Sequence, residues 1–409
     1  MTQFPDIKAN ATSPHPSRRS LVGLDWFTFF LADVQTGFGP FVAVYLTTAQ
    51  WTQQDIGFIL SITGIIGLLG RMPGGALVDA ARSERNVAAI AVVCIGISAL
   101  MLAAWPLFPL VFLSTVLSSS ANCVLAPAIG AISLGLVGHF AIGPRLGRNA
   151  RFASLGTVVA AAAMGVGGYF FSSRSVFIIT ALLLGPTLIA LWQIRSGEVD
   201  PTRAHGGSKP LVHPEQNLLR LALNGPLLAF AVCNLLFQLA NAAMLPLMGS
   251  ILTMRSANWA TVLIAACIIV PQLIVAALSP WVGRRADKWG RRPLLLIGFG
   301  ALPLRCLLFA YMPDPSFVVF EQILDGISAA VLGVLVPLVV ADISRNTGRF
   351  NLAQGVIGTA VGIGAALSTS FAGYVSDHSG SQSAFLDLAA IAACGFAFVL
   401  FVMPETRPR

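Results

Sequence analysis

The chain has 409 residues, of which 56% are hydrophobic and only 10% are charged, and its formal net charge is +8 at pH 7. Soluble globular domains carry about 25% charged residues, so this composition excludes a soluble protein and indicates an integral membrane protein with many spanning segments. The net charge suggests nucleic acid as a partner, but the positions of the basic residues, given below, explain the charge without one.

The first 20 residues are polar and lack the pattern of a cleavable signal peptide, so we expect a tail at 1–20. The first apolar run, 22–46, is long enough to cross a membrane, because about 20 apolar residues span a core of about 30 Å. Asp25 lies near the start of this run, where we expect it to be solvated at the membrane interface, and Asp33 lies about eleven residues into the run. At 1.5 Å per residue, Asp33 is about 16 Å deep, close to the midplane.

An ionisable side chain at this depth is costly and usually faces a cavity or a partner. We therefore interpret Asp33 as a candidate for proton coupling or substrate binding, and we group Gln35 with it. The alternative is that Asp33 is permanently hydrogen-bonded and has a structural role.

Eleven further apolar runs of spanning length follow, at 54–78, 86–104, 107–137, 152–172, 176–194, 221–250, 259–282, 293–311, 317–341, 351–375 and 384–403. The links are short except for a polar stretch at 196–219. The sequence thus predicts an all-α integral membrane protein with twelve transmembrane helices. We divide it into an N-terminal six-helix bundle (21–195), a cytoplasmic linker (196–219), a C-terminal six-helix bundle (220–403) and a tail (404–409).

The basic residues lie mostly on one side of these spans. If the N-terminus is cytoplasmic, all of the 25 Lys and Arg residues fall in cytoplasmic segments except Arg71, Arg174, Arg255 and Arg305. The positive-inside rule then places both termini and the linker in the cytoplasm. We expect a multi-pass protein of the cell inner membrane.

The two halves repeat. The link after the second run reads GGALVDAARSER, and the link after the eighth reads VGRRADKWGRRP. Gly75 and Asp79 match Gly283 and Asp287 at one offset of 208 residues. GRNARF at 147–152 and RNTGRF at 345–350 form a second matching pair. Parallel repeats of this kind occur in secondary transporters, which place the substrate site between the halves near the midplane.

The link GRRADKWGRR (283–292) is similar to the loop motif G-x-x-x-D-[RK]-x-G-[RK]-[RK] of the major facilitator superfamily. GALVDAARSER (75–85) resembles the usual first copy, although Ala80 and Ser83 replace basic residues, and the ending PETRP is also similar to that of the family. The resemblance implies a secondary transporter with a cytoplasmic gate motif, formed here by Gly75, Asp79, Gly283, Asp287, Lys288, Gly290, Arg291 and Arg292.

In the family, these motif residues latch the cytoplasmic side in the outward-facing state. An aspartate at a helix end can meet the positive N-terminal dipole of a neighbouring helix. The alternative is that the basic residues are ordinary cytoplasmic charges of a membrane protein.

The repeat also relates polar residues within the spans. The offset of 208 brings Asp33 onto Asn241, with Gln238 about one turn earlier. Because the first and seventh spans line the cavity in the superfamily, Gln238 and Asn241 are candidates for substrate contact. Residues of this kind more often form hydrogen bonds between helices, which is the role that we favour for them.

Glu321 and Asp325 lie one turn apart on the tenth run, at a depth similar to that of Arg305 on the ninth. We expect an ion pair between Arg305 and one of these carboxylates, which leaves the other as a second candidate for proton coupling. Arg71 lies two turns before Asp79 and is expected to be a gate partner, with contact to an anionic substrate as the alternative.

Other patterns narrow the function. Met244 and Met248 are soft ligands that suit copper, although methionine also fills gaps in cores. In AAAAMGVGG (160–168), Ala163 and Met164 replace the Gly-Pro of an antiporter motif, which disfavours a drug–proton antiporter. The chain has no catalytic motif and no nucleotide-binding loop, so we expect no enzyme activity and no cofactor.

The sequence therefore predicts a secondary active transporter that moves a small organic solute by alternating access. We expect proton coupling, a lipid bilayer environment and a monomer, with no nucleic-acid partner. A metal-ion transporter, for example for copper, and a drug efflux antiporter are the alternatives.

Overall fold

The computed structural model describes residues 16–36, 42, 45–46, 49–170, 174–206, 225–248, 257–312, 315–345 and 347–407. All regular structure in these ranges is helical. The elements are α1 (Arg18–Thr36), α3 (Gln53–Leu69), α4 (Arg71–Ala80), α5 (Glu84–Ala104), α6 (Phe108–Phe170), α7 (Ser175–Gln193), the 3-10 turn η1 (Ser196–Glu198), α8 (Pro201–Ala204), α10 (Gly225–Asn241), α12 (Ala257–Trp289), α13 (Arg291–Tyr311), α14 (Pro315–Ile343), α15 (Phe350–Ser379) and α16 (Ser381–Phe401).

In the described ranges, eight helical stretches are long and apolar enough to cross a membrane. They are Glu84–Ala104, Phe108–Met164, Ser175–Gln193, Gly225–Met248, Arg291–Tyr311, Phe317–Ile343, Phe350–Ser379 and Ser381–Phe401. The all-helical, multi-span character predicted from the sequence is confirmed. The number of twelve spans and their orientation stay predictions.

Three predicted spans take forms that the hydropathy pattern does not reveal. Helix α6 contains two helices that meet at Gly138, where φ is 68° and ψ is 177°, and the predicted runs 107–137 and 152–172 lie on either side of it. The predicted run 54–78 covers both α3 and α4, which meet at Gly70.

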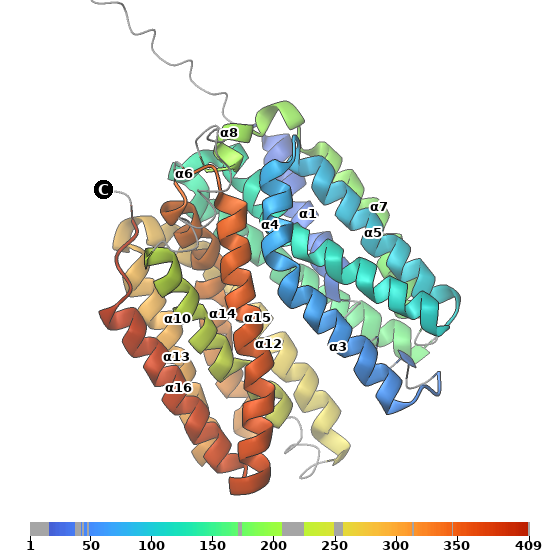
Figure 1. Cartoon of the computed structure of the whole chain (residues 1–409), viewed down its shortest axis with the longest axis vertical. Coiled ribbons are helices and arrows are strands. Elements are labelled where there is room, and N and C mark those ends of the chain that lie inside the picture. The colour runs from blue at the N-terminus through green and yellow to red at the C-terminus, as the bar shows by residue number, and fades with distance from the viewer. Residues whose placement is uncertain are drawn as a thin grey trace, which may run out of the picture.

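The helices gather in two groups, shown side by side in Figure 1. The first group comprises α1 and α3–α8 and surrounds a core that includes Leu24, Phe27 and Leu125. The second group comprises α10–α16, and its core includes Phe230 and Phe299. Between the groups, α12 and α14 pack against α6, and α15 packs against α4.

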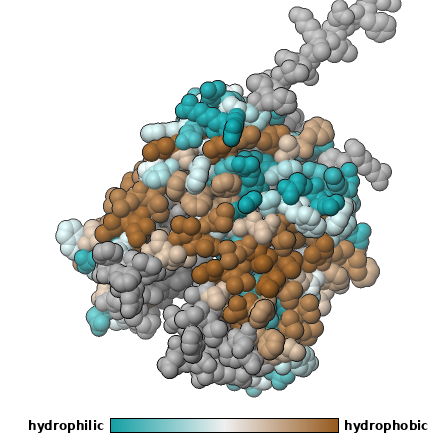
Figure 2. All heavy atoms as spheres, turned by 180° about the vertical axis from the view of Figure 1, so that it is seen from behind, coloured by the Kyte–Doolittle hydropathy of each residue, from teal (hydrophilic) through white to brown (hydrophobic). Residues whose placement is uncertain are grey.

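The outer surface is apolar where a bilayer would contact it. Figure 2 shows hydrophobic surface across the middle of one face and hydrophilic side chains gathered toward its upper end. Large apolar side chains such as Leu182, Phe320 and Phe401 are exposed on their helices. Exposed apolar area of this extent is typical of a surface that faces lipid or a partner.

The linker was predicted as a loop, and its first part instead contains two short helical turns. Asp200 caps α8, because its side chain accepts hydrogen bonds from the backbone N–H groups of Thr202 and Arg203. The backbone N–H of Asp200 donates to the carbonyl of Gly135 in α6. The segment 196–206 is therefore packed onto the first helix group. Residues 1–15 of the predicted tail and 207–219 of the predicted linker lie outside the described residues.

Candidate functional site

The clearest polar contact between the two helix groups is made by Asp79, in the last turn of α4. Its Oδ1 accepts hydrogen bonds from the backbone N–H and the side-chain amide of Asn351, at 3.3 and 2.8 Å. Its Oδ2 accepts a bond of 2.8 Å from the N–H of Leu352. These N–H groups belong to the first turn of α15, where a helix has no internal acceptors and a positive dipole.

The carboxyl group of Asp79 is buried, and burial raises its pKa above the ordinary value, while the hydrogen bonds from Leu352 and Asn351 act in the opposite direction. The predicted contact between a motif aspartate and a helix N-terminus is present. Its action as a latch stays a prediction.

Gly75 allows this contact to form. A methyl group at Gly75 would lie 2.1 Å from the carbonyl oxygen of Asn351, so a larger residue would separate α4 from α15. Gly283 has the matching position in the second copy, where a methyl group would lie 2.3 Å from the carbonyl oxygen of Gly143 in α6. The two motif glycines thus sit at close backbone contacts between the two groups.

The charged residues of the second copy mainly contact their own group. The guanidinium of Arg291 donates to Asp342 at 2.9 Å and to Asp287 at 3.2 Å. Asp287 therefore has an ionic partner in its own group, at the start of α13, unlike Asp79. Gly290 separates α12 from α13 with a φ of 94°, a conformation that favours glycine.

The C-terminal PETRP stretch closes over this region. Glu405 accepts hydrogen bonds from the backbone N–H groups of Arg291 and Arg292, at 2.8 and 3.1 Å. Arg407 donates to the carbonyl of Lys288 at 3.0 Å, and the guanidinium of Arg292 donates to the carbonyl of Leu400.

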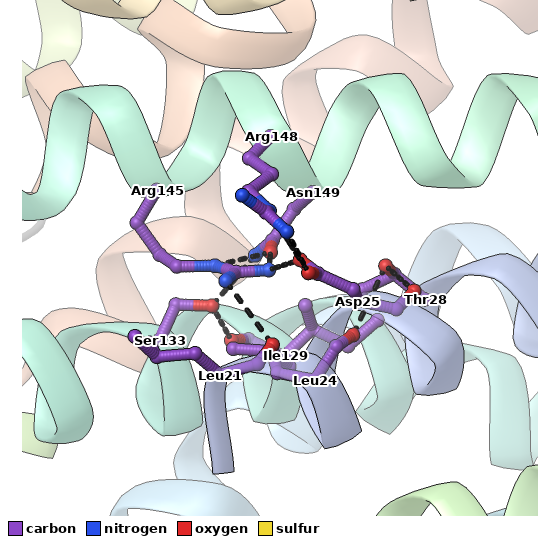
Figure 3. A network of polar contacts seen from close by, with 9 residues as sticks. All are labelled: Leu21, Leu24, Asp25, Thr28, Ile129, Ser133, Arg145, Arg148 and Asn149. Carbon is purple, nitrogen blue, oxygen red and sulfur yellow. Dashed lines mark hydrogen bonds and ion pairs between the residues drawn. The ribbon is translucent and has the colours of Figure 1, made fainter. Parts of the chain in front are cut away.

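A second polar network lies within the first group (Figure 3). Asp25 of α1 is 1% exposed. Its carboxylate pairs with Arg145 at 2.5 Å and with Arg148 at 2.6 Å, both from α6. Arg145 also donates to Asn149, which donates in turn to Ser133 at 2.7 Å.

The sequence reasoning placed Asp25 at the solvated membrane interface, and this was wrong, because the two arginines enclose it. The cluster of basic residues at 145–151 was visible in the sequence but was interpreted only as cytoplasmic charge. The signal that would have linked this basic cluster to Asp25 is that Asp25 is a single acidic residue in another helix.

A cavity of about 360 Å³ lies between the two groups. Its wall is mostly apolar and comes from α1, α6, α14 and α15, with Thr28, Asn149 and Gln354 among its polar members. A second cavity of about 280 Å³ shares Ala126 and Gln354 with the first. Its lining consists of Arg71, Asn122, Cys123, Ala126, Pro127, Gln354, Gly355 and Gly358.

The predicted site residues of the first span are only partly described. The backbone at 33–36 is the last turn of α1, directly after Ala32, which lines the larger cavity. The side chains of Asp33 and Gln35 lie outside the described residues. Their roles therefore stay predictions.

The predicted site residues of the seventh span do not line either cavity. Asn241 accepts a hydrogen bond of 2.9 Å from Arg305, and Gln238 is half-buried beside Gly364 of α15. Asn241 therefore forms a hydrogen bond between helices, as favoured from the sequence, and Gln238 packs between α10 and α15. Nothing in the described residues tests whether either one contacts substrate.

The predicted ion pair of Arg305 forms with Asp325, at 2.5 Å. Arg305 is 2% exposed and also donates to Gln322 at 2.9 Å, a partner that the sequence reasoning missed. Glu321 is 4% exposed, and neither of its carboxylate oxygens has a hydrogen-bond partner among the described residues. Glu321 is therefore the carboxylate that does not pair with Arg305, the second candidate that the sequence predicted for proton coupling.

Met244 and Met248 are both fully buried in the core of the second group. The Sδ of Met244 lies 3.5 Å from the Sγ of Cys306. In the described part of the chain, no three His, Cys, Asp or Glu side chains group in a way that would hold a metal ion.

Comparisons with known proteins agree with this architecture. A family model described as Major Facilitator Superfamily matches residues 26–275 and 230–409. An uncharacterised MFS-type transporter of Mycobacterium tuberculosis is 38% identical over 392 residues, which cover 94% of this chain and 93% of that protein.

Two solved structures have a similar fold. The human organic anion transporter MFSD10 superposes with a TM-score of 0.75 at 15% identity, covering 94% of this chain and 100% of that one. The Escherichia coli fucose:proton symporter FucP gives a TM-score of 0.73, also at 15% identity, over 94% and 100% of the two chains.

Proposed function

The chain belongs to the major facilitator superfamily, and we propose that it is a proton-coupled secondary active transporter. In this proposal it carries a small organic solute across the cell inner membrane by alternating access. The observation that carries the proposal is the pair of adjoining cavities between the two helix groups. A site whose wall comes from both groups changes its exposure when the groups rock against each other.

The contacts of Asp79, Gly75 and Gly283 supply the gate of this cycle. They join the groups through a few backbone and side-chain contacts at helix ends, beside the packing of α12 and α14 against α6. Contacts of this kind can break and re-form as the groups move. The proposal includes twelve spans in two six-helix bundles, both termini in the cytoplasm, the domain boundaries predicted above and a monomer.

Two carboxylates are the candidates for proton coupling. Asp33 follows the cavity-lining turn of α1, and its predicted depth is close to the midplane. Glu321 is buried without a hydrogen-bond partner among the described residues. An ionised carboxylate in such a place is costly unless it is paired, so a cycle that protonates and deprotonates it can drive a conformational change.

Transport into proteoliposomes tests the proposal. With a metabolite panel inside or outside, an imposed pH gradient is expected to drive accumulation of at least one solute by the wild type. Asp33→Asn and Glu321→Gln are expected to uncouple transport from the pH gradient. Arg82→Gln, at an exposed position, serves as a control. If the gradient drives no solute of the panel, or if both carboxyl variants keep the wild-type pH dependence, the proton-coupled mechanism is wrong.

Drug efflux is a second candidate, because resistance proteins are among the relatives. Multidrug resistance protein 2 of Bacillus subtilis is 28% identical over 163 residues, and the class B tetracycline resistance protein of Escherichia coli is 30% identical over 138 residues. These matches cover 40% and 33% of this chain. Drug accumulation in cells that express the protein distinguishes export from uptake. No observation on the described residues favours the metal-ion alternative.

A further inference from the structure

Arg71 begins α4 and reaches across to the second helix group. Its Nη1 donates a hydrogen bond of 2.5 Å to the carbonyl of Gly358 in α15. A methyl group on Gly355 would lie 2.6 Å from the carbonyl oxygen of Arg71, so the backbones of α4 and α15 are in close contact here. The Arg71 side chain lines the smaller cavity together with Asn122 and Gln354.

Arg71 is half-buried, and it differs from the buried arginines by lacking a carboxylate partner among the described residues. Arg145 pairs with Asp25, Arg291 with Asp342 and Arg305 with Asp325. In the same part of the chain, no carboxylate oxygen lies within 4.0 Å of an Arg71 nitrogen. A half-buried cation without a carboxylate partner attracts a counter-charge, and a ligand can supply it.

The guanidinium keeps donors available for such a ligand. An arginine has five N–H groups in a planar fork, and one hydrogen bond, to Gly358, accounts for only part of them. The Nε of Arg305 is buried and has no hydrogen-bond partner among the described residues. No nitrogen of Arg71 is in this situation. The remaining donors of Arg71 are therefore accessible from the cavity that it lines.

Gln354 provides a second polar group at the same place. It lies one helical turn before Gly358 and lines both cavities. Its side-chain Nε2 is buried and has no hydrogen-bond partner among the described residues. A buried amide without a partner is unfavourable, and a ligand acceptor at the junction of the two cavities would supply the missing hydrogen bond.

The surrounding walls define the rest of the ligand. Among the described lining residues of the two cavities, Arg71 is the one charged side chain. The larger cavity continues from Gln354 and Ala126 along apolar side chains such as Ile129, Leu332 and Val336. Sites that combine an apolar wall with a few convergent polar groups bind small molecules with a matching polar end.

We propose that Arg71 binds the anionic group of the transported solute, and that this solute is an amphiphilic monoanion with a carboxylate or sulfonate at one end and an apolar body. Arginine matches a carboxylate through two parallel hydrogen bonds. The apolar body lies in the larger cavity, and Gln354 donates to the anionic group. The inference rests on the proposed transport function and specifies its substrate class.

The test uses titration calorimetry on the purified full chain in detergent. The probes are benzoate, 2-naphthoate and 2-naphthalenesulfonate, with benzamide, 2-naphthamide and 2-naphthylmethylamine as uncharged and cationic matches. We expect at least one anion to bind the wild type tenfold or more tightly than its matched amide and amine. Comparing the affinities of 2-naphthoate and 2-naphthalenesulfonate decides which of the two anionic groups fits the site better.

The variants assign that preference to Arg71. Arg71→Gln is expected to weaken anion binding at least tenfold and to leave naphthamide binding unchanged, which also shows that the variant is folded. Arg71→Lys is expected to retain part of the preference, because it keeps the charge but loses the planar fork. Arg82→Gln, at an exposed arginine, is the matched control and is expected to bind as the wild type does.

Three results would overturn the inference: amines that bind better than anions, anions that bind no better than amides, and an anion preference that survives in Arg71→Gln. These results leave pH-driven transport in proteoliposomes untouched. Conversely, Arg71-dependent anion binding without any gradient-driven transport would contradict the proposed function and keep the binding site.

Discussion

The carboxylate of Asp79 accepts a 2.8 Å hydrogen bond from the side-chain amide of Asn351, 272 residues further along the chain. This bond joins α4 to the first turn of α15 and hence one helix group to the other. Its neighbours, Gly75 and the N–H of Leu352, make the same junction. The junction can therefore be weakened by changes that leave each group intact.

Asp79→Ala removes the acceptor for two backbone N–H groups and one amide at the start of α15. Loss of a side chain that caps a helix costs about 0.5–2 kcal/mol. We expect faster hydrogen exchange of the amides at 351–354, measured by mass spectrometry. Asp287→Ala is the matched control, because Asp287 bonds to Arg291 within its own group. Equal exchange of these amides in wild type and Asp79→Ala would contradict the assignment.

Gly75→Ala places a methyl group 2.1 Å from the carbonyl oxygen of Asn351. Overpacking of this kind typically costs about 1–3 kcal/mol, so we expect a lower melting temperature in detergent. Gly64→Ala in α3 is the control, because a methyl group there meets nothing within 4 Å. Alanine is the better helix former by about 1 kcal/mol, so Gly64→Ala is expected to be neutral or stabilising. A Gly75→Ala protein as stable as wild type would mean that the contact is not tight.

We expect His205 to make the junction between the two helix groups sensitive to pH. Its Nε2 lies 3.1 Å from Glu84, and its carbonyl accepts from the N–H of Phe350. The nearby Glu84 carboxylate raises the pKa of His205 above its ordinary value, with further help from the charge of Asp79 and against the effect of burial.

Because the pKa is higher in the folded protein, the stabilisation by His205 is complete below about pH 6.5, the pKa of an unfolded histidine. It is lost as the pH rises through the folded value. We expect the melting temperature to fall over this window and His205→Gln to remove that part of the pH dependence. His378→Gln, at an exposed histidine, is the control. A wild-type slope that persists in His205→Gln would assign the dependence to another group.

Arg305 and Asp325 form an ion pair in which the arginine is the more deeply buried partner. Removing one partner of a buried pair strands the other and costs about 3–5 kcal/mol. We expect Asp325→Asn to destabilise the protein strongly, since Asn241 and Gln322 cannot neutralise Arg305. The double variant Arg305→Met with Asp325→Asn is expected to recover part of the loss in melting temperature. If the loss in the double variant equals the sum of the losses in the two single variants, the pair contributes little.

The membrane helices and the repeat were open to prediction because they are written along the chain. Hydrophobic length identifies a span, and depth follows from 1.5 Å per residue. The match of Gly75 and Asp79 with Gly283 and Asp287 identifies the two halves. The predicted helix-end contact of Asp79 also follows, because a motif aspartate there meets the dipole of any helix that begins beside it.

The pairing of polar residues was harder to predict. The sequence placed Arg305, Glu321 and Asp325 at similar depth, and left open which carboxylate pairs with Arg305. It assigned Asp25 to the interface, where the structure encloses it between Arg145 and Arg148. In both cases the missing information is the rotation of each helix about its own axis, which is set by packing against neighbours.

The sequence by itself determined that this is a helical membrane protein in which one loop motif occurs twice, because composition, periodicity and internal offsets are properties of the chain alone. Only the tertiary structure decided that Asp325 pairs with Arg305, that Glu321 is left without a hydrogen bond among the described residues, and that Arg71 faces a cavity without a carboxylate partner there. A helix of known depth still presents any of its faces to its neighbours. The packing of small residues and large side chains between helices fixes that choice.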